Sequence, residues 1–418
     1  MKIADIYNLY KEHFLVDTDT RKIRENSIFF ALSGENFNGN SFAKEALEKG
    51  AKYCIVDDKD YVLGEKTILV NDTLSTLQKL AIYHRKKLSI PIIGLTGSNG
   101  KTTTKELIHI VLSTQYQTTS TKGNLNNHIG VPLTLLSMTP KTEIGVIEMG
   151  ANHQKEIEFL SNICEPDFGY ITNFGKAHLE GFGGIEGVIK GKSELYTFLK
   201  KNGKTAFVNP DDSKQLELTK GIQKIFLNTK SVSLNSTFPF LTLEYDGDLI
   251  NTNLVGEYNF YNILVAITIG EHFSIDKENI RHAITNYRSD NNRSQFIQND
   301  KNNILLDAYN ANPSSVEMAL KNFSRSDYKN KVVILGDMFE LGKYAEIEHQ
   351  KIIDLSKVLN LTELFVVGEN FHKTKAENKF KTFEELKSHF STFPLENKNI
   401  LIKGSRGMAL ERLLEILN

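Results

Sequence analysis

A glycine-rich loop between a predicted strand and a predicted helix limits the possible folds of this chain more than any other segment does. The loop is Gly94-Leu95-Thr96-Gly97-Ser98-Asn99-Gly100-Lys101-Thr102-Thr103, and it joins an apolar run over 90–96 to a helical pattern that continues to Leu112. Backbone N–H groups and the helix N-terminus of such a loop hold phosphate oxygens, while its lysine neutralises their charge. The sequence therefore predicts a phosphate-binding loop in which Lys101 reaches the β- and γ-phosphates and the Thr102 hydroxyl binds Mg²⁺.

The loop is a shortened variant of the usual pattern. Leu95 stands five residues before the Gly-Lys pair, where glycine is usual. The glycine that serves in its place is Gly97, only three residues before the pair. A glycine-rich turn that only begins a helix is the alternative, but Gly-Lys-Thr-Thr at a strand–helix junction favours ATP binding. We expect the nucleotide to contact Gly97, Ser98, Asn99, Gly100, Lys101, Thr102 and Thr103.

Length and composition exclude several classes of protein. The chain has 418 residues, which at roughly 150 residues per domain predicts two or three domains. With 50 Lys and Arg against 51 Asp and Glu, the chain lacks the positive electrostatic field of a nucleic-acid binder. No apolar run approaches the ~18 residues that suggest a membrane span, so we expect no membrane insertion. The N-terminal residues lack the apolar core of a secretory signal, and two cysteines make no disulfide framework, so we expect a cytoplasmic protein.

Turn-forming and polar segments divide the chain into three predicted units, over 1–88, 89–288 and 289–418. The first is small and mixed α/β, with an apolar stretch at 27–32 and a helical run at 43–47. The second and third alternate strands with helical patterns, which is typical of parallel βαβ units. The predicted strands are 90–96, 144–148, 168–172, 205–208, 304–307, 331–335, 364–367 and 399–402. A β-rich stretch at 227–254 precedes a predicted helix at 258–270, and the polar segment 286–303 is interpreted as a linker.

Three possible metal ligands fall at or just beyond the carboxyl ends of predicted strands, where open parallel sheets bind ligands. They are Thr102, Glu148 and His178. Mg²⁺ prefers oxygen ligands, so Thr102 and Glu148 together with phosphate oxygens make a plausible site. From residue types alone an alternative stays open, in which Glu148 pairs with a cation and His178 only hydrogen-bonds a loop. Asn259 and Asn262 likewise either cap the helix that they open or contact an adenine edge.

The loop Thr-Gly-Ser-Asn-Gly-Lys-Thr-Thr resembles that of the Mur ligases and the related folylpolyglutamate synthases, and further segments resemble Mur ligases from about Asp19 to Glu411. These segments include Asp19-Thr20-Arg21, Asn124 to Pro132, Ala177-His178-Leu179-Glu180, Asp307 to Pro313, Leu335 to Gly342, and Ile402 to Gly407. The resemblance implies an α/β fold of three domains. A central ATPase domain with a phosphate loop and a parallel sheet is flanked by a small α/β N-terminal domain for the UDP-substrate and a Rossmann-like C-terminal domain for the amine substrate.

The resemblance also assigns residues to the nucleotide and metals. Asn259 and Asn262 match adenine contacts, Arg293 matches a γ-phosphate arginine, and Asp307 matches a ribose-binding acid. His178 would bind a second Mg²⁺ with a carbamylated lysine, and the segment Gly191-Lys192-Ser193-Glu194 makes Lys192 the candidate. Without the modification Lys192 is interpreted as a surface helix lysine, and Lys190 is close enough in sequence to compete for the assignment.

Substrate contacts follow from the same resemblance. Thr20 and Arg21 match the uridine-binding segment, and Asn126, Asn127 and His128 would face the incoming UDP-sugar peptide. Lys403 and Arg406 would bind an acyl phosphate or a substrate carboxylate, since arginine suits bidentate oxyanion contacts.

The implied reaction is ATP-dependent amide-bond formation. The diaminopimelate-adding relative carries an Asp-Asn-Pro-Arg element that is absent here, which favours the family member that adds D-Ala-D-Ala to UDP-MurNAc-tripeptide. ATP would phosphorylate the terminal carboxylate, and the dipeptide amine would displace phosphate, with Lys101, Lys192, His178 and Arg293 as catalytic residues and two Mg²⁺ ions as cofactors. We expect a monomer. Another amide ligase, such as a folylpolyglutamate synthase, and a non-catalytic ATP-binding module are the alternatives.

Overall fold

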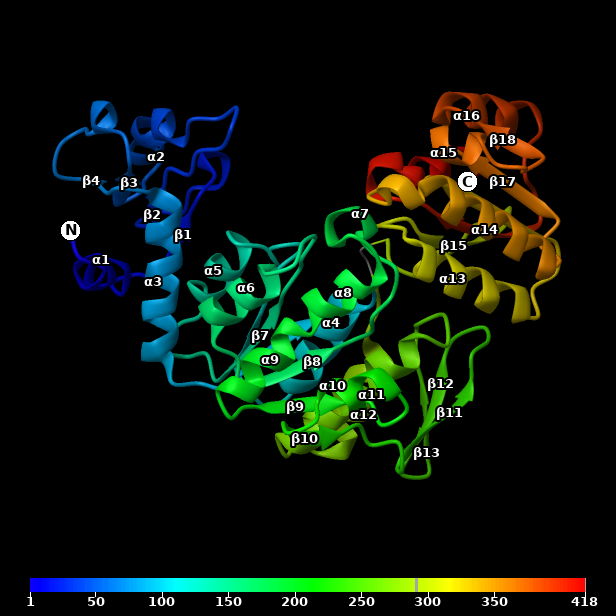
Figure 1. Cartoon of the computed structure of the whole chain (residues 1–418), viewed down its shortest axis with the longest axis horizontal. Coiled ribbons are helices and arrows are strands. Elements are labelled where there is room, and N and C mark those ends of the chain that lie inside the picture. Colours follow the sequence, from blue (N-terminus) through cyan, green and yellow to red (C-terminus); the bar gives the residue numbers. More distant parts are fainter. Residues whose placement is uncertain (290–291, 418) are drawn as a thin grey trace.

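Four sheets organise residues 1–289 and 292–417, which are the residues that this computed structural model describes. Three of them form one α/β domain each, and the domains follow one another along the chain (Figure 1). The fold class predicted from the sequence is therefore confirmed. Within these described residues, no helix is both long enough and apolar enough to cross a membrane.

The N-terminal domain has a four-stranded parallel sheet in the order β1-β2-β3-β4. The predicted apolar stretch forms the fully buried β2, and the predicted helical run forms α2. The strands are β1 (Val16–Asp17), β2 (Ile28–Phe30), β3 (Tyr53–Val56) and β4 (Thr67–Leu69). The helices are α1 (Ile3–Tyr10), α2 (Ala43–Glu48), α3 (Thr73–Leu88) and the short 3₁₀ turns η1 (Thr20–Lys22), η2 (Gly39–Phe42) and η3 (Lys59–Tyr61).

Helix α3 leads from the N-terminal domain into the central one (Figure 1). Asp72 caps its start by accepting a hydrogen bond from the backbone N–H of Ser75. Near its end, the buried Arg85 donates to the carbonyls of Cys164 and Glu165 (both 2.9 Å) and pairs with Asp167 (2.8 Å). The N-terminal domain is therefore anchored to the central sheet by a continuous helix.

The central domain is a six-stranded parallel sheet in the order β10-β9-β8-β5-β7-β6. Its middle strands β5 and β7 are buried along their whole length and apolar up to their last residues, Thr96 and Glu148, as expected of a sheet covered by helices on both faces. The strands are β5 (Ile92–Thr96), β6 (Thr118–Ser120), β7 (Ile144–Glu148), β8 (Phe168–Ile171), β9 (Thr205–Val208) and β10 (Gln223–Phe226). The helices are α4 (Lys101–Leu112), α5 (Gly130–Leu135), α6 (Glu156–Cys164), α7 (Leu179–Phe182), α8 (Ile185–Lys192), α9 (Glu194–Lys201) and α10 (Ser213–Leu218).

Strand order places the glycine-rich loop at a switch point. The chain leaves β5 for β6 and β7 on one side and then returns to β8 on the other side of β5. Ligands of open α/β sheets bind in the crevice at the carboxyl ends of such strands. The loop between β5 and α4 opens into this crevice.

The predicted β-rich stretch forms a separate antiparallel sheet, β11 (Val232–Ser236), β12 (Thr242–Tyr245) and β13 (Asp248–Asn251). Two helices follow, α11 (Asn259–His272) and α12 (Lys277–Asn286). Helix α11 is buried on nearly all sides and packs on α4 in a shared apolar core, so α11 braces the helix that begins at the phosphate loop.

The C-terminal domain has six strands in the order β14-β15-β19-β16-β17-β18, and only β14 is antiparallel to its neighbour. The strands are β14 (Gln295–Gln298), β15 (Asn302–Asp307), β16 (Lys331–Gly336), β17 (Glu363–Val367), β18 (Asn378–Phe380) and β19 (Lys398–Lys403). The helices are α13 (Pro313–Arg325), α14 (Ala345–Val358), α15 (Glu369–His372), α16 (Phe383–Thr392) and α17 (Leu414–Leu417), with 3₁₀ turns η4 (Gly342–Tyr344), η5 (Arg406–Met408) and η6 (Leu410–Leu413).

One expectation about this region was wrong in part. The polar segment 286–303 was expected to be a linker, but β14 and the start of β15 lie within it; residues 290 and 291 are outside the described part of the chain. Strand β14 lies at the sheet edge and none of its residues is fully buried, so it pairs through its backbone and needs no apolar pattern.

Candidate active site

The phosphate loop is held tightly against the end of β8. Gly97 and Gly100 both have positive φ angles, +145° and +79°. A Cβ atom at Gly97 would lie 2.0 Å from Oγ1 of Thr172, and one at Gly100 would lie 2.8 Å from Oδ1 of Asn262. Both positions therefore require glycine, because a side chain would clash and the backbone conformation disfavours one.

Lys101 folds back over this loop. Its Nζ donates to the carbonyls of Gly97 (2.8 Å) and Ser98 (3.2 Å). Burial lowers the pKa of Lys101, while the Glu148 carboxylate acts in the opposite direction. The ammonium thus occupies the mouth of the loop, where incoming phosphate oxygens can replace the two carbonyls.

The loop opens into a cavity of about 930 Å³ that all three domains line. Most of the residues predicted for the site lie on its wall, namely Ser98, Asn99, Gly100, Lys101, Thr102, Thr103, Asn126, Asn127, His128, Glu148, His178, Asn259, Asn262, Arg293, Asp307 and Lys403. Leu74 and Gln78 of α3 complete the wall on the N-terminal side. The volume is at the upper end of the range for ligand pockets, so the cavity has room for more than one substrate.

Five predicted residues do not line this cavity. Gly97 is the part of the loop that packs against Thr172, and Lys192 lies behind the cavity wall. Thr20 and Arg21 belong to the N-terminal domain, where the exposed Arg21 pairs with Asp19 at 2.8 Å. Arg406 is exposed and pairs with Glu411 at 3.3 Å.

Glu148 ends β7 with its carboxylate buried in the wall. Oε1 accepts a hydrogen bond from the side-chain amide of Asn126 (2.8 Å), whereas the buried Oε2 has no hydrogen-bond partner among the described residues. A buried carboxylate oxygen without a protein partner is rare, and this one is free to accept from water or to contact a cation. Thr102 lines the same cavity, so the donor set fits a hard cation that also takes phosphate oxygens and water. Within the described residues, no three His, Cys, Asp or Glu side chains cluster as a preformed metal site.

His178 stands at the junction of the central and C-terminal domains. Its backbone is left-handed (φ 52°), and its Nδ1 lies 2.5 Å from Oε2 of Glu340. Contact with His178 lowers the pKa of Glu340. The backbone N–H of Glu180 also donates to the carbonyl of Glu340 (3.1 Å), so the C-terminal domain supports the segment that carries His178.

Lys192 is fully buried at the end of α8. Its Nζ donates to the carbonyl of Ala151 (3.0 Å) and lies 5.1 Å from the ring centroid of Phe182. Burial, and then the charge of Lys101, place the pKa of Lys192 well below its ordinary value. The interpretation of Lys192 as a surface lysine is therefore wrong, whereas Lys190 is exposed. Ala151 lines the cavity, so one peptide group separates the amine from it.

Asn259 and Asn262 form a buried chain of hydrogen bonds between helices. Thr104 Oγ1 donates to Asn262 Oδ1 (3.0 Å), Asn262 Nδ2 donates to Asn259 Oδ1 (2.8 Å), and Asn259 Nδ2 donates to the carbonyl of Val255 (2.8 Å). Neither side chain caps α11, so the capping interpretation is wrong. Asn262 ties α11 to α4, Asn259 supports Asn262 from within α11, and both residues still line the cavity.

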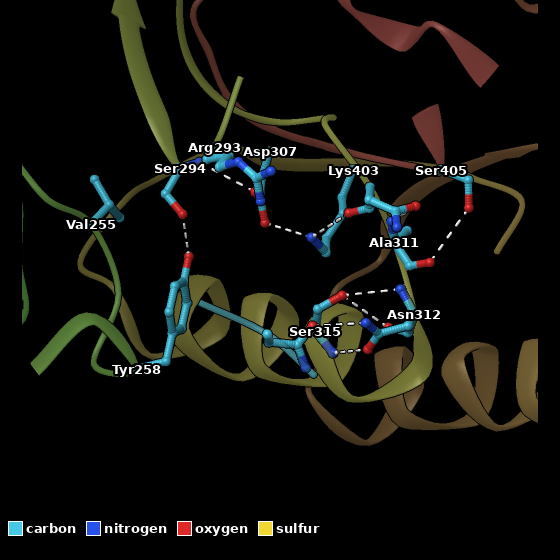
Figure 2. Close-up of polar contacts among 12 residues, drawn as sticks. Val255, Tyr258, Arg293, Ser294, Asp307, Ala311, Asn312, Ser315, Lys403 and Ser405 are labelled. Atoms are coloured by element: carbon cyan, nitrogen blue, oxygen red, sulfur yellow. Dashed lines mark hydrogen bonds and ion pairs between the residues drawn. The ribbon is translucent and has the colours of Figure 1, made fainter. Parts of the chain in front are cut away.

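On the C-terminal side, Asp307 and Lys403 end neighbouring strands and pair with each other at 2.5 Å (Figure 2). Asp307 also accepts from the backbone N–H of Ser294 (3.2 Å), and the hydroxyls of Ser294 and Tyr258 lie 2.6 Å apart. Lys403 is 2% exposed and also donates to the carbonyl of Asn310 (3.3 Å). A residue predicted for ribose and one predicted for substrate thus form a single ion pair.

The contacts between the central and C-terminal domains could not be predicted from the sequence. Asn312 caps α13 through Ser315, as Figure 2 shows, and its Nδ2 donates to Oδ1 of Asn99 in the phosphate loop (2.7 Å). Lys176 donates through its backbone to Ser314 Oγ (2.8 Å) and pairs with Glu348 at 3.0 Å. An Asn-Pro pair before a helical pattern signals the cap, but no local signal indicates the partner across the interface.

Three family models match the chain in succession. They are described as Mur ligase family, catalytic domain (residues 13–93), Mur ligase middle domain (95–270) and Mur ligase, glutamate ligase domain (292–416). Among curated relatives, the UDP-N-acetylmuramoyl-tripeptide–D-alanyl-D-alanine ligase of Bacillus subtilis is 34% identical over 423 residues, which cover 96% of this chain and 92% of the relative.

Solved structures agree with this similarity. The chain resembles MurF from Acinetobacter baumannii with a TM-score of 0.84 and 31% identity, over 96% of this chain and 92% of that one. It also resembles the MurF ligase of Thermotoga maritima, solved in complex with ADP, with a TM-score of 0.83 and 26% identity over 96% of each chain.

Proposed function

The chain belongs to the Mur ligase family, and from that premise we propose that it joins D-alanyl-D-alanine to a UDP-N-acetylmuramoyl-tripeptide at the expense of ATP. The observation that carries the proposal is the single cavity into which the phosphate loop, Glu148 and the cationic C-terminal residues all face. A carboxylate is a poor electrophile, so ATP first converts the terminal carboxylate of the tripeptide into an acyl phosphate. The dipeptide amine then displaces phosphate through a tetrahedral intermediate.

The nucleotide binds along the loop and under the C-terminal domain. Lys101 exchanges its loop carbonyls for β- and γ-phosphate oxygens, and Arg293 meets the γ-phosphate from the C-terminal side of the cavity. Asn259 and Asn262 lie beyond the loop on the adenine side. Asp307 contacts the ribose with one carboxylate oxygen while Lys403 holds the other.

Two divalent cations complete the site in this proposal. Thr102 and Glu148 would hold one Mg²⁺, and His178 with a carbamylated Lys192 would hold the second, where these ions would neutralise phosphate charge. The unpartnered Glu148 oxygen supports the first position. For the second, burial lowers the pKa of Lys192 and so favours the neutral amine, the form that attacks carbon dioxide in carbamate formation.

The substrates enter from the two outer domains. Asn126, Asn127 and His128 would face the peptide of the UDP-substrate, whose uridine would reach Thr20 and Arg21 in the N-terminal domain. Lys403 and Arg406 would receive the dipeptide or its acyl phosphate partner on the C-terminal side. We propose domain boundaries after residues 88 and 288. We also propose that the protein is a monomer that acts in the cytoplasm.

One coupled assay tests the function. The full chain is incubated with ATP and D-Ala-D-Ala, with the UDP-MurNAc-tripeptide carrying either lysine or diaminopimelate, and product mass and released phosphate are measured. We expect phosphate release that requires both substrates and a product heavier by the dipeptide less one water. ATP binding without turnover would instead favour a non-catalytic module, and turnover only with folate and glutamate would favour a folylpolyglutamate synthase.

A further inference from the structure

The ring of Tyr309 lies directly against the guanidinium of Arg293. Cζ of Arg293 is 3.6 Å from the ring centroid, well inside the ~6 Å over which a cation–π interaction acts. Both residues line the cavity, and Tyr309 is two residues beyond Asp307 on the loop after β15. The ring and the guanidinium thus form one contacting pair on the C-terminal side of the cavity.

Little else fixes the inner part of the Arg293 side chain. Its Nε is buried and has no hydrogen-bond partner within residues 1–289 and 292–417. An arginine presents its donors as a rigid planar fork, so the plane of the guanidinium decides where its donors point. A ring in face contact sets that plane, and it does so without using any of the donors.

The backbone around Arg293 is held on both sides. The N–H of Tyr309 donates to the carbonyl of Asn292 (3.2 Å), and the N–H of Ser294 donates to Asp307 (3.2 Å). Asn292 and Ser294 both have left-handed backbones, with φ angles of 56° and 50°. Such conformations persist where the surroundings impose them, so this frame places the base of the Arg293 side chain and leaves its end to the ring.

We propose that Tyr309 is a positioning residue whose ring orients the Arg293 guanidinium toward the terminal phosphate of ATP. This inference rests on the proposed function, in which Arg293 contacts the γ-phosphate. Arg406 is the other guanidinium near the ring, with Cζ at 5.8 Å, but it is exposed and paired with Glu411. The Tyr309 ring therefore orients Arg293 rather than Arg406.

The test compares affinities for ADP and for the β,γ-imido analogue of ATP, measured by calorimetry with Mg²⁺ on the full chain. The variants are Tyr309→Ala, Tyr309→Phe and Arg293→Ala, and a melting curve of each checks that it folds. We expect Tyr309→Ala to weaken binding of the analogue by roughly 3- to 30-fold, the range of a cation–π contact, while ADP binding stays unchanged. Tyr309→Phe keeps the ring and should keep the wild-type preference.

The results distinguish a wrong assignment of Arg293 from a wrong role for Tyr309. If Arg293→Ala binds both nucleotides as the wild type does, the assignment of Arg293 to the γ-phosphate fails, and the role of Tyr309 fails with it. If Arg293→Ala loses the preference for the analogue but Tyr309→Ala keeps it, only the positioning role is overturned. Equal weakening of ADP and the analogue in Tyr309→Ala would show that the ring contacts the base or ribose instead. A Tyr309→Phe variant as weak as Tyr309→Ala would show that the hydroxyl is what matters, and would also overturn the proposal.

Discussion

Burial lowers the pKa of both Lys101 and Lys192, yet the two amines have different surroundings. Lys101 lies at the mouth of the phosphate loop on the cavity wall, and Lys192 lies behind the wall against the carbonyl of Ala151. The first can meet a phosphate directly, while the second can act on the cavity only if its amine is extended by a modification. The two residues therefore call for different tests.

Substituting Lys101 by alanine should abolish ligation and leave the fold intact. The lysine neutralises charge on the transferred phosphoryl group, and losing such a group costs on the order of 10³-fold or more in rate. Phosphate release measures the activity, and the far-ultraviolet circular dichroism spectrum and melting temperature check the fold. Near-normal product formation by a folded Lys101→Ala protein would show that the loop does not act on the nucleotide.

The carbamate proposal is tested by Lys192→Met, which removes the amine but keeps most of its buried volume. We expect the variant to lose most activity, because the carbamate would supply the oxygen ligands that Mg²⁺ prefers. It should also lose the bicarbonate-dependent mass increase that one carbamate, chemically trapped before mass spectrometry, adds to the wild type. Lys190→Met is the matched control, because Lys190 lies on the same helix but is exposed. Loss of activity in the control but not in Lys192→Met would move the assignment to Lys190.

At the scale of single elements, the loop after β16 depends on a buried histidine of α14. His349 is 0% exposed; its Nε2 accepts from the backbone N–H of Met338 (3.0 Å), and its Nδ1 lies 2.7 Å from the carbonyl of Ala345. A carbonyl only accepts, so Nδ1 carries the proton and the ring is neutral. Burial lowers the pKa of His349, although Ala345, Asp337 and Glu348 act in the opposite direction.

This arrangement predicts a pH dependence of stability. Because the folded pKa lies below the ordinary value near 6.5, the stabilisation by neutral His349 is complete above that pH and is lost as the pH falls through the folded pKa. Urea unfolding between pH 8 and pH 5 should show a slope up to about 1.4 kcal/mol per pH unit steeper in the wild type than in His349→Gln. Equal slopes would contradict the prediction. His84 is also buried with a lowered pKa, so the comparison with the variant isolates His349.

The strands differ in how well their sequences predict them. Buried parallel strands such as β5, β7 and β16 are continuous apolar runs and stand out from their surroundings. Edge strands such as β14 and β18 are short, none of their residues is fully buried, and each is held by backbone hydrogen bonds to one neighbouring strand. Strand β14 pairs with β15, the next strand along the chain, but its sequence Gln295-Phe296-Ile297-Gln298 is too short and too polar to show a strand pattern, so the segment is interpreted from the sequence as a linker.

At the scale of the whole molecule, the C-terminal domain is docked on the central one around the loop after β8. Lys176, Glu180 and Asn99 each contact a C-terminal residue, and Figure 1 shows α7 reaching toward that domain. Docking thus closes the cavity between the phosphate loop and Arg293, so the position of the domain sets the geometry of the site.

Removing the ion pair of this interface should favour an undocked arrangement. Lys176→Met deletes the contact with Glu348, which is worth on the order of 1 kcal/mol for a partly exposed pair and corresponds to a few-fold shift between docked and undocked forms. Small-angle X-ray scattering of the variant should give a larger radius of gyration than that of the wild type. Lys351→Met is the control, since Lys351 pairs with the same Glu348 but from its own helix. An equal change in both variants would mean that Glu348 acts within its domain.

The sequence by itself determined the phosphate loop, the alternation of strands and helices, and the family, because these depend on short segments whose residues are neighbours along the chain. Only the tertiary structure decided which of those segments contact each other and which side chains become buried. It buried Lys192, paired Asp307 with Lys403, linked Asn262 of α11 to Thr104 of α4, and placed Tyr309 against Arg293. Each of these facts depends on strand order and on the docking of domains, which bring together atoms that no local pattern relates.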